Sequence, residues 1–506
     1  MTEHLRADIV VVGGGAAGCV LAGTLSEDGR QSVLLLEAGP DYGPFEEGRW
    51  PADLLDCRSP ARSHDWHPDG PPDDSRARVI GGSSVSNAGW TTVGAPPDYD
   101  AWAGPSGGAW DYATFAPYLT EAARRLRVRA VPESDRVAVH RAVVAGAAQL
   151  GLPFLPDIND PEAREGAGWV PLNAVGHTRW NAAFAFLDPA RHRPNLRVLD
   201  DAVAVRLTVR GGRATGVEIV RGGRAETVSA GTVVLATGAY GNPPLLLRSG
   251  IGPERQLRAL GVPVTLPLAG VGQNLIDHPK AHLTLAPAEA LGAPDRAAYM
   301  AQTLIKARSS MAADDYWDLH LVPSAGAGED EFGRYVGPMA FSLYVFVLAP
   351  RSRGSVRARS LDPLAPPVIE HGYFTDPEGH DRQVALDGVD LAHKLAETGP
   401  VSALATFTPW DAARRSAIAE APGGYWHPVG TCAMGPADDP SAVAGPDGRV
   451  HGLSNVYVGD ASLMPVIPRA NTHLTTVAVA ARVAAAIRRA ESAAPAGALP
   501  EVESIR

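Results

Sequence analysis

The chain has 506 residues, 45% of them hydrophobic and 20% charged, and a formal net charge of −11 at pH 7. It is too long for one ordinary hydrophobic core, so two domains or one elaborated α/β architecture are expected. The acidic balance argues against a nucleic acid as partner, because such binding depends on basic contacts to phosphate.

Three cysteines, Cys19, Cys57 and Cys432, are scattered along the chain and show no metal-ligand spacing, so neither a disulfide framework nor a metal site is indicated. The N-terminal apolar run is too short for a signal peptide, and no stretch of about 18 apolar residues follows it. We therefore expect a soluble, cytoplasmic protein without a membrane span.

The first predicted elements form a dinucleotide-binding unit. Residues 9–12 predict a buried strand, and Gly13, Gly15 and Gly18 follow in G-x-G-x-x-G spacing before a helix. The glycines let the turn tighten and let the backbone approach a pyrophosphate at the helix N-terminus. The next strand ends in Glu37, at the distance where an acid accepts the ribose hydroxyls of an adenine dinucleotide. Strand, glycines, helix and acid in this order make that reading stronger than a solvated surface turn.

A second glycine-rich turn lies at 77–90, where Gly81, Gly82 and Ser83 offer amides and hydroxyls without bulky side chains. It suits contact with a planar ring system, and by itself it equally suits a surface loop. Further along, 232–243 predicts another strand of the first domain. Residues 340–350 alternate in a way that predicts a strand buried on both sides.

Near the C-terminus, a helical apolar stripe follows His473 directly. It consists of Val477, Val479, Ala480, Val483, Ala484 and Ile487. The N-terminus of this helix carries a partial positive charge, which would stabilise an anion bound at that end. The tail 491–506 is rich in Ala, Pro and Glu and is expected to be mobile.

Taken together, these motifs resemble those of the glucose-methanol-choline (GMC) oxidoreductases, in the order of that family and from about residue 7 to about residue 488. The remaining motifs that carry the resemblance are "GGSSVSN", "GAYGNPPLLLRSGIGP", "VGQNLIDHP", "LAPRSRGSVRARSLDP", "HPVGTCAMG" and "ANTHLTTVAVAARVA". The resemblance implies an α/β (mixed α+β) fold, with a Rossmann-like FAD-binding domain and a discontinuous substrate domain built on an antiparallel sheet. The expected FAD-binding segments are 1–150, 195–285 and 425–490, and the expected substrate-domain segments are 151–194 and 286–424.

The resemblance also implies the site residues. Those expected to contact FAD are Gly13, Gly15, Gly18, Glu37, Gly82, Ser83, Asn87, Val203, Asp460, Ala461 and Thr472. Some family members attach the flavin to a histidine where this chain has Ser86, so we expect non-covalent FAD. Asn242 stands where the family prefers Ser or Thr. No metal is implied.

The implied activity is oxidation of an alcohol to an aldehyde or ketone, by hydride transfer to flavin N5 and removal of the hydroxyl proton. A neutral histidine suits the proton transfer because its ordinary pKa is about 6.5. We expect His427 to be the general base and His473, in the loop with Asn471, to orient and polarise the alcohol. Two packed core histidines are the alternative, and it is less favoured because both lie in turns where the resemblance expects active-site residues.

The substrate is left open. The aromatic residues that could surround it are Tyr299, Tyr316, Trp317, Tyr344, Phe346 and Trp426, most of which are expected in the core. They favour an aryl or other primary alcohol over a sugar, and no anionic cluster favours choline. The electron acceptor is either oxygen or a quinone-type carrier. Two other functions stay open: cyanohydrin cleavage by a hydroxynitrile-lyase-like enzyme on this fold, and a non-catalytic flavin-binding module.

Overall fold

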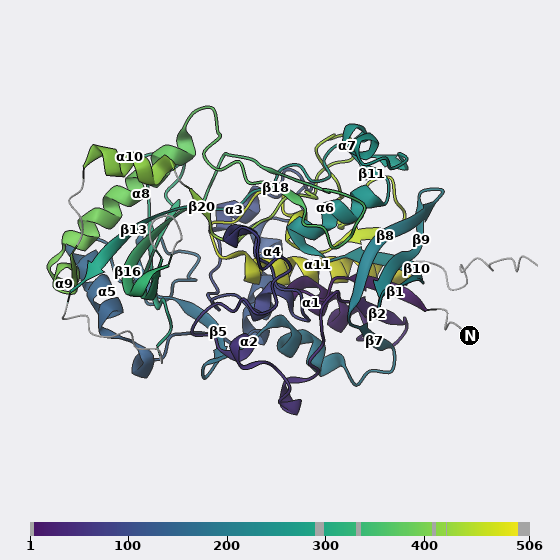
Figure 1. The fold of residues 1–506 in the computed structure, drawn as a ribbon, viewed down its shortest axis with the longest axis horizontal. Helices are drawn as coiled ribbons and strands as arrows, with labels where there is room; N and C mark the ends of the chain where they lie inside the picture. The colour runs from purple at the N-terminus through teal and green to yellow at the C-terminus, as the bar shows by residue number, and fades with distance from the viewer. Residues whose placement is uncertain (1–4, 289–297, 330–334, 407–410, 421, 494–506) are drawn as a thin grey trace, which may run out of the picture.

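The computed structural model describes residues 5–288, 298–329, 335–406, 411–420 and 422–493. Its main feature is a pair of sheets at opposite ends of the long axis, with the C-terminal helix α11 (Thr472–Ala493) reaching the centre from the side of the first sheet (Figure 1). The mixed α/β class with two domains is thereby confirmed.

The first sheet has the order β7-β2-β1-β10-β9-β8, with β21 beside β10. Its parallel strands are β7 (Leu196–Leu199), β2 (Val33–Leu36), β1 (Arg6–Val12), the second half of β10 (Arg224–Leu235) and β21 (Val456–Val458). Runs such as "IVVV" and "VLLL" are apolar on both faces because helices or loops cover both sides of a parallel sheet. The predicted strand 232–243 is confirmed only in its first part: β10 belongs to this sheet and ends at Leu235, and the helix α6 (Gly238–Arg248) begins three residues later.

Two glycine-glycine hairpins add the antiparallel part of this sheet. Strand β8 (Ala202–Arg210) turns at Gly211 and Gly212 into β9 (Arg213–Arg221), which turns at Gly222 and Gly223 into β10. All four glycines have positive φ, as the tight two-residue hairpin turn requires. One long strand, β10, thus joins the hairpins to the parallel core.

Helices α1 (Ala16–Leu25) and α11 pack on each other beside the first sheet, and α4 (Tyr112–Arg125) packs on α11. The predicted apolar stripe of α11 is confirmed, since all six of its residues are buried. The helix begins at Thr472, so His473 lies inside its first turn and not ahead of it. It extends to Ala493, and the rest of the expected tail lies outside the described residues.

The second sheet is antiparallel, with the order β19-β13-β16-β15-β14-β4 and β20 beside β13. Its strands are β19 (Ala405–Thr406), β13 (Pro279–Pro287), β16 (Tyr335–Val347), β15 (Leu319–Glu329), β14 (Thr303–Ala307), β4 (Gly166–Trp169) and β20 (Gly423–Gly424). One face, with Leu283, Leu321 and Val345, packs against α8 (His380–Glu397) and α5 (Ala138–Gln149). The other face carries polar and aromatic side chains. The antiparallel second sheet is confirmed, and the segment boundaries of the two domains stay a prediction.

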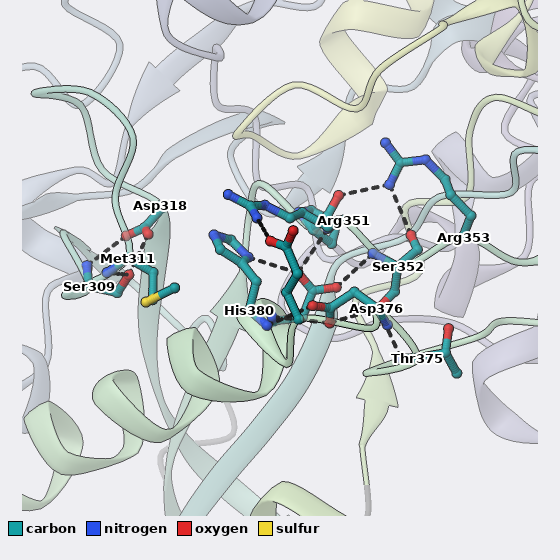
Figure 2. Close-up of polar contacts among 12 residues, drawn as sticks. Ser309, Met311, Asp318, Arg351, Ser352, Arg353, Thr375, Asp376 and His380 are labelled. Atoms are coloured by element: carbon teal, nitrogen blue, oxygen red, sulfur yellow. Dashed lines mark hydrogen bonds and ion pairs between the residues drawn. The ribbon is translucent and has the colours of Figure 1, made fainter.

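A polar network ties the start of α8 to the loop 350–354 (Figure 2). The buried carboxylate of Asp381 accepts hydrogen bonds from the backbone N–H groups of Arg351 and Ser352, both at 2.8 Å. Arg353 then donates to Asn274 Oδ1 at 3.0 Å, and Asn274 donates to the carbonyl of Pro465 at 3.2 Å. This part of the second domain therefore supports the loops that precede β13 and α11.

The glycine turn provides a test of the packing. A methyl group on Gly18 would lie 1.8 Å from the carbonyl oxygen of Gly13, which is backbone and cannot move aside. We expect Gly18→Ala to lower the free energy of unfolding by about 1–3 kcal/mol or more, the usual effect of overpacking. Urea unfolding measures it, and Gly104→Ala, with no atom within 4 Å of the added methyl, is the control. Equal stability of the two variants would contradict a close-packed turn.

Candidate active site

The predicted pyrophosphate turn lies between β1 and α1. Gly13 has φ +101°, and an added Cβ would lie 2.6 Å from Ala236 O, so only glycine fits. The second glycine-rich turn meets the first one directly, because a Cβ on Gly82 would lie 2.7 Å from Gly15 Cα. The two turns predicted from separate parts of the sequence thus form one backbone cradle without side chains.

Glu37 lies at the end of β2 beside this cradle. Its carboxylate accepts hydrogen bonds from the backbone N–H groups of Gly14 and Gly39, both at 2.8 Å. Burial raises the pKa of this carboxyl group. Ala202 N–H donates to Glu37 O at 2.8 Å, which brings Val203 next to the same strand end. Glu37 and Val203, both predicted to contact FAD, therefore lie together at the carboxyl end of β2.

Ser83 and Asn87 lie on the second turn, which a fully buried arginine holds in place. Arg179 donates to five backbone carbonyls at 2.5–2.8 Å, those of Leu54, Asp56, Ser59, Val85 and Asn87. The sequence pattern did not single out Arg179, because its partners are carbonyl groups and leave no side-chain signal. Ser86 is half-buried in the same turn.

Asp460 and Ala461 follow β21. The carboxylate of Asp460 accepts from Gly238 N–H at 2.7 Å, from Asn242 Nδ2 at 2.9 Å and from Ser462. Asn242 also accepts from the Thr237 hydroxyl at 2.6 Å. The asparagine that departs from the family pattern therefore joins the start of α6 (Gly238–Arg248) to the loop with Asp460.

His427 follows strand β20 and is fixed through its backbone. Asp277 Oδ1 accepts from the N–H groups of His278 and His427, at 2.8 and 2.9 Å. The preceding residue, Trp426, has φ +59°, a left-handed conformation that a bulky residue adopts only when its surroundings impose it. Trp426 is 39% exposed, and its indole N–H donates to the carbonyl of Pro72 at 2.9 Å. The strain and the carboxylate together set the position of the histidine.

A chain of hydrogen bonds determines which nitrogen of His427 carries the proton. Thr92 Oγ1 accepts from Asn471 N–H at 2.9 Å and donates its proton to Asn471 Oδ1 at 2.8 Å. The NH₂ group of Asn471 therefore faces His427 and donates to Nε2 at 3.3 Å. On the other side, Nδ1 of His427 lies 3.0 Å from Nδ1 of His278. In a neutral ring whose Nε2 accepts, Nδ1 must be the donor to His278.

Thr472 and His473 begin α11. Asn471, two residues before His473, makes the contact with His427. Both ring nitrogens of His473 are buried and have no hydrogen-bond partner among the described residues. Two orphaned nitrogens of this kind fit a group that the protein binds.

Burial keeps the histidines of this region uncharged. It holds the pKa of His427 well below its ordinary value of 6.5, and the neighbouring His278, Arg76 and His320 lower it further. Burial alone lowers the pKa of His473 to about 4 and is the main cause that lowers the pKa of His278 to about 3. His427 is therefore a neutral imidazole at neutral pH.

Two of these histidines were missed as site residues. His278 lies just before β13, in a motif quoted only for the family, and His320 lies on β15. His278 Nε2 and both nitrogens of His320 have no hydrogen-bond partner within the described part of the chain. The period-2 alternation of 278–282 was the available signal for His278. No comparable signal marks His320.

Arg469 holds the loop that carries Asn471. It is buried, donates to Asp98 at 2.6 Å, and binds both carboxylate oxygens of Asp314 at 2.7–2.8 Å. Its carbonyl accepts from the indole N–H of Trp317 at 3.1 Å. Since Asp98 comes from α3 (Pro96–Asp100) beside the first sheet and Asp314 precedes β15, Arg469 joins both halves of the molecule. Trp317 and Tyr299 are core residues, as expected.

Metal clusters and membrane-spanning helices are not found in the residues that the structure describes. Within them, no group of three or more His, Cys, Asp or Glu side chains is placed to hold a metal ion. In the same residues, no helix is long and apolar enough to cross a membrane. The three cysteines are free and buried.

A glycine cradle on a parallel sheet, combined with buried neutral histidines beside an antiparallel sheet, is the arrangement expected of a flavin-dependent oxidoreductase. The family profile described as GMC oxidoreductase matches residues 7–280, and its C-terminal counterpart matches 350–480. The chain is 33% identical to a GMC-type oxidoreductase of Rhodococcus erythropolis, over 96% of this chain and 99% of that one. It is 32% identical to a 5-(hydroxymethyl)furfural oxidase of Methylovorus sp., over 95% and 98% of the two chains.

Among solved structures, the pyridoxine 4-oxidase from Mesorbium loti is 28% identical, with a TM-score of 0.84 and coverage of 95% and 99%. The chain belongs to the GMC oxidoreductase family and is an FAD-dependent oxidoreductase. The described residues fit FAD, because the cradle leaves no side chain where a pyrophosphate would approach and His473 offers unpartnered nitrogens.

The buried ion pair of Arg469 gives a second prediction. Arg469→Met leaves the buried Asp98 without its counter-charge, so we expect a loss of about 3–5 kcal/mol in the free energy of unfolding. The double variant Arg469→Met with Asp98→Asn removes that charge and should recover part of the loss, as urea unfolding of all variants would measure. Strictly additive effects would contradict a coupled pair.

The neutral histidines predict how stability depends on pH. Below pH 6.5 the unfolded chain binds protons that buried His278, His427 and His473 do not bind. The free energy of unfolding must therefore decrease as the pH is lowered below about 6.5, by up to about 1.4 kcal/mol per pH unit for each histidine. Urea unfolding at pH 7.5 and 5.5 measures this. His140 on α5 is also buried, and burial lowers its pKa to about 3. In the variant His140→Asn, the slope of the free energy of unfolding against pH should therefore be smaller by the contribution of one histidine. Equal stability at both pH values would contradict the assignment.

Proposed function

We propose that this oxidoreductase oxidises an alcohol to an aldehyde or ketone, with His427 as the general base. The observation that supports this most directly is the accepting Nε2 of a buried, neutral His427. A base needs a free lone pair, and the amide of Asn471 is a weak donor at 3.3 Å that an alcohol hydroxyl can displace. The similarity to a 5-(hydroxymethyl)furfural oxidase favours an aryl-type primary alcohol.

His427 takes the hydroxyl proton at Nε2 in this proposal. The resulting imidazolium keeps its Nδ1 proton in the hydrogen bond to His278, so the ring does not have to rotate. Arg76 and the neighbouring histidines oppose the positive charge, which makes the protonated state short-lived and favours return of the base to its neutral form.

His473 binds the alcohol oxygen in the same proposal. It lies in the first turn of α11, where the helix dipole is positive, and its N–H can donate to an oxygen that gains negative charge. Bound FAD supplies the acceptor for the hydride. We expect it to be non-covalent because Ser86 offers no ring nitrogen for attachment, and to be held by the two glycine turns, Glu37, Val203 and the segment of Asp460 and Ala461.

Anaerobic titration with a panel of aryl, aliphatic and sugar alcohols tests the proposal, with flavin absorbance as the readout. Bleaching by one class of alcohol supports oxidation, and readmitted air shows whether oxygen is the acceptor. A protein that binds FAD, is not bleached by any alcohol and cleaves a cyanohydrin would favour the lyase alternative. A protein that does neither would favour the flavin-binding module.

Substitution of the base gives the matching prediction. His427→Ala should lower the rate of flavin reduction by roughly 10²–10⁴-fold, because it removes general-base catalysis. Asn471→Asp places a carboxylate beside Nε2, which raises the pKa of His427, so the acid limb of the rate profile should move to higher pH. Stopped-flow reduction from pH 5 to 9 measures both. Unchanged profiles in both variants would refute the assigned base.

A further inference from the structure

One row of side chains crosses the second sheet on its polar face. Register pairs Lys306 with His320, His320 with Phe346, and Phe346 with Lys280. Directly paired residues of neighbouring strands point to the same face, so these four side chains lie side by side. They lie opposite the apolar face that α8 and α5 cover.

The row contains two of the three lysines among the 45 basic residues of the chain. Lysines 280 and 306 are 8% and 1% exposed, and only Lys394, on α8, lies at the surface. Buried lysines are unusual because removing an ammonium group from water is costly unless it is compensated. Two of them in one row therefore need an explanation.

Lys306 and Lys280 differ in their polar partners. Lys306 Nζ donates to Ile158 O at 2.6 Å, and burial lowers its pKa to about 7. Lys280 Nζ lies 4.8 Å from the ring centre of Trp426 and 5.8 Å from that of Tyr344. Within the described ranges, no oxygen forms a hydrogen bond or ion pair with it. Asp73, which also borders Gly423, accepts from Gly424 N–H and does not reach ion-pair distance.

Lys280 is connected to His427 through two aromatic rings. Phe346, its cross-strand neighbour, stacks on Tyr425 with ring centres 3.4 Å apart, and Tyr425 lies 4.1 Å from the ring of His427. Along β13, Lys280 follows His278 by two residues, which is about 7 Å in an extended strand. Lys280 therefore lies two residues along the chain from the histidine that contacts Nδ1 of His427.

The geometry points to an anion-binding subsite at Lys280, which binds a carboxylate carried by the alcohol substrate. This inference rests on the proposed alcohol oxidation and narrows its substrate class to an aryl methanol with a carboxylate across the ring. Lys280 supplies three N–H donors for a carboxylate, and the rings of Trp426 and Tyr344 lie beside its Nζ. A quaternary ammonium substrate is disfavoured, because its charge would meet the ammonium group of Lys280.

A local cation is needed here for a physical reason. The net charge of −11 repels anions from the protein as a whole, so long-range attraction does not concentrate such a substrate. A single unpaired lysine matches a monoanion, whereas a phosphate would call for further cationic donors.

Anaerobic reduction of the holoenzyme by 4-(hydroxymethyl)benzoate and by benzyl alcohol tests the subsite. In the wild type, the rate of flavin reduction divided by the dissociation constant should be at least about tenfold higher for 4-(hydroxymethyl)benzoate than for benzyl alcohol. The reason is that a hydrogen bond between charged groups stabilises a complex by about this factor or more. Lys280→Met should lower this ratio about tenfold or more, and Lys280→Arg should keep most of it. Lys394→Met, at the surface, is the matched control and should leave the ratio unchanged.

Binding of 4-methylbenzoate, which has the carboxylate but no hydroxyl group, gives a second readout through the flavin spectrum. It should bind the wild type and Lys394→Met alike and bind Lys280→Met at least about tenfold more weakly. If no alcohol bleaches the wild type, the proposed function fails, and this titration still decides the subsite.

Two results would overturn the inference: a wild type that does not prefer the carboxylate substrate, or Lys280→Met with the wild-type ratio and the wild-type affinity for 4-methylbenzoate. If Lys280→Met purifies without FAD, the wild-type preference and the Lys280→Arg variant give the answer.

Discussion

The hydrogen bond from the amide of Asn471 to Nε2 of His427 is the contact on which the rest of the site depends. It has the right direction only because Thr92 holds the other side of that amide, and because His278 receives the proton on Nδ1. Asp277 fixes the backbone of His427, and Arg469 fixes the loop of Asn471 from both halves of the molecule. Most of the polar contacts described above therefore act together to present one lone pair.

Burial of uncharged histidines has two linked consequences. It keeps the base deprotonated at neutral pH, since desolvation disfavours imidazolium. It also lowers the free energy of unfolding in acid, because the unfolded chain binds protons that the buried histidines of the folded chain do not bind.

Much of the fold was predictable from local patterns. The strand 9–12, the glycine turn and the apolar stripe of α11 are each confirmed, and each rests on the sequence spacing of neighbouring residues. The predicted strand 232–243 is confirmed only as far as Leu235, because α6 begins at Gly238. The second sheet followed from the family resemblance. The site was only partly predictable: His427, His473 and Asn471 were named, whereas His278 as a partner, His320, Thr92 and Arg469 were not. Their partners lie far away in the chain, as with Thr92 and Asn471, so no spacing reports the contact.

The dinucleotide-binding unit follows from local patterns of residues, because a turn that admits only glycine and strands apolar on both faces are local steric requirements. The sequence also indicates which histidine belongs to the family's motif. The packing of distant segments decides which nitrogen of that histidine accepts a hydrogen bond, which lysine lacks a polar partner among the described residues, and which side chains share a face of the second sheet. The physical reason is that protonation and ion pairing depend on distances of a few ångströms through space, and these arise only when distant segments pack together.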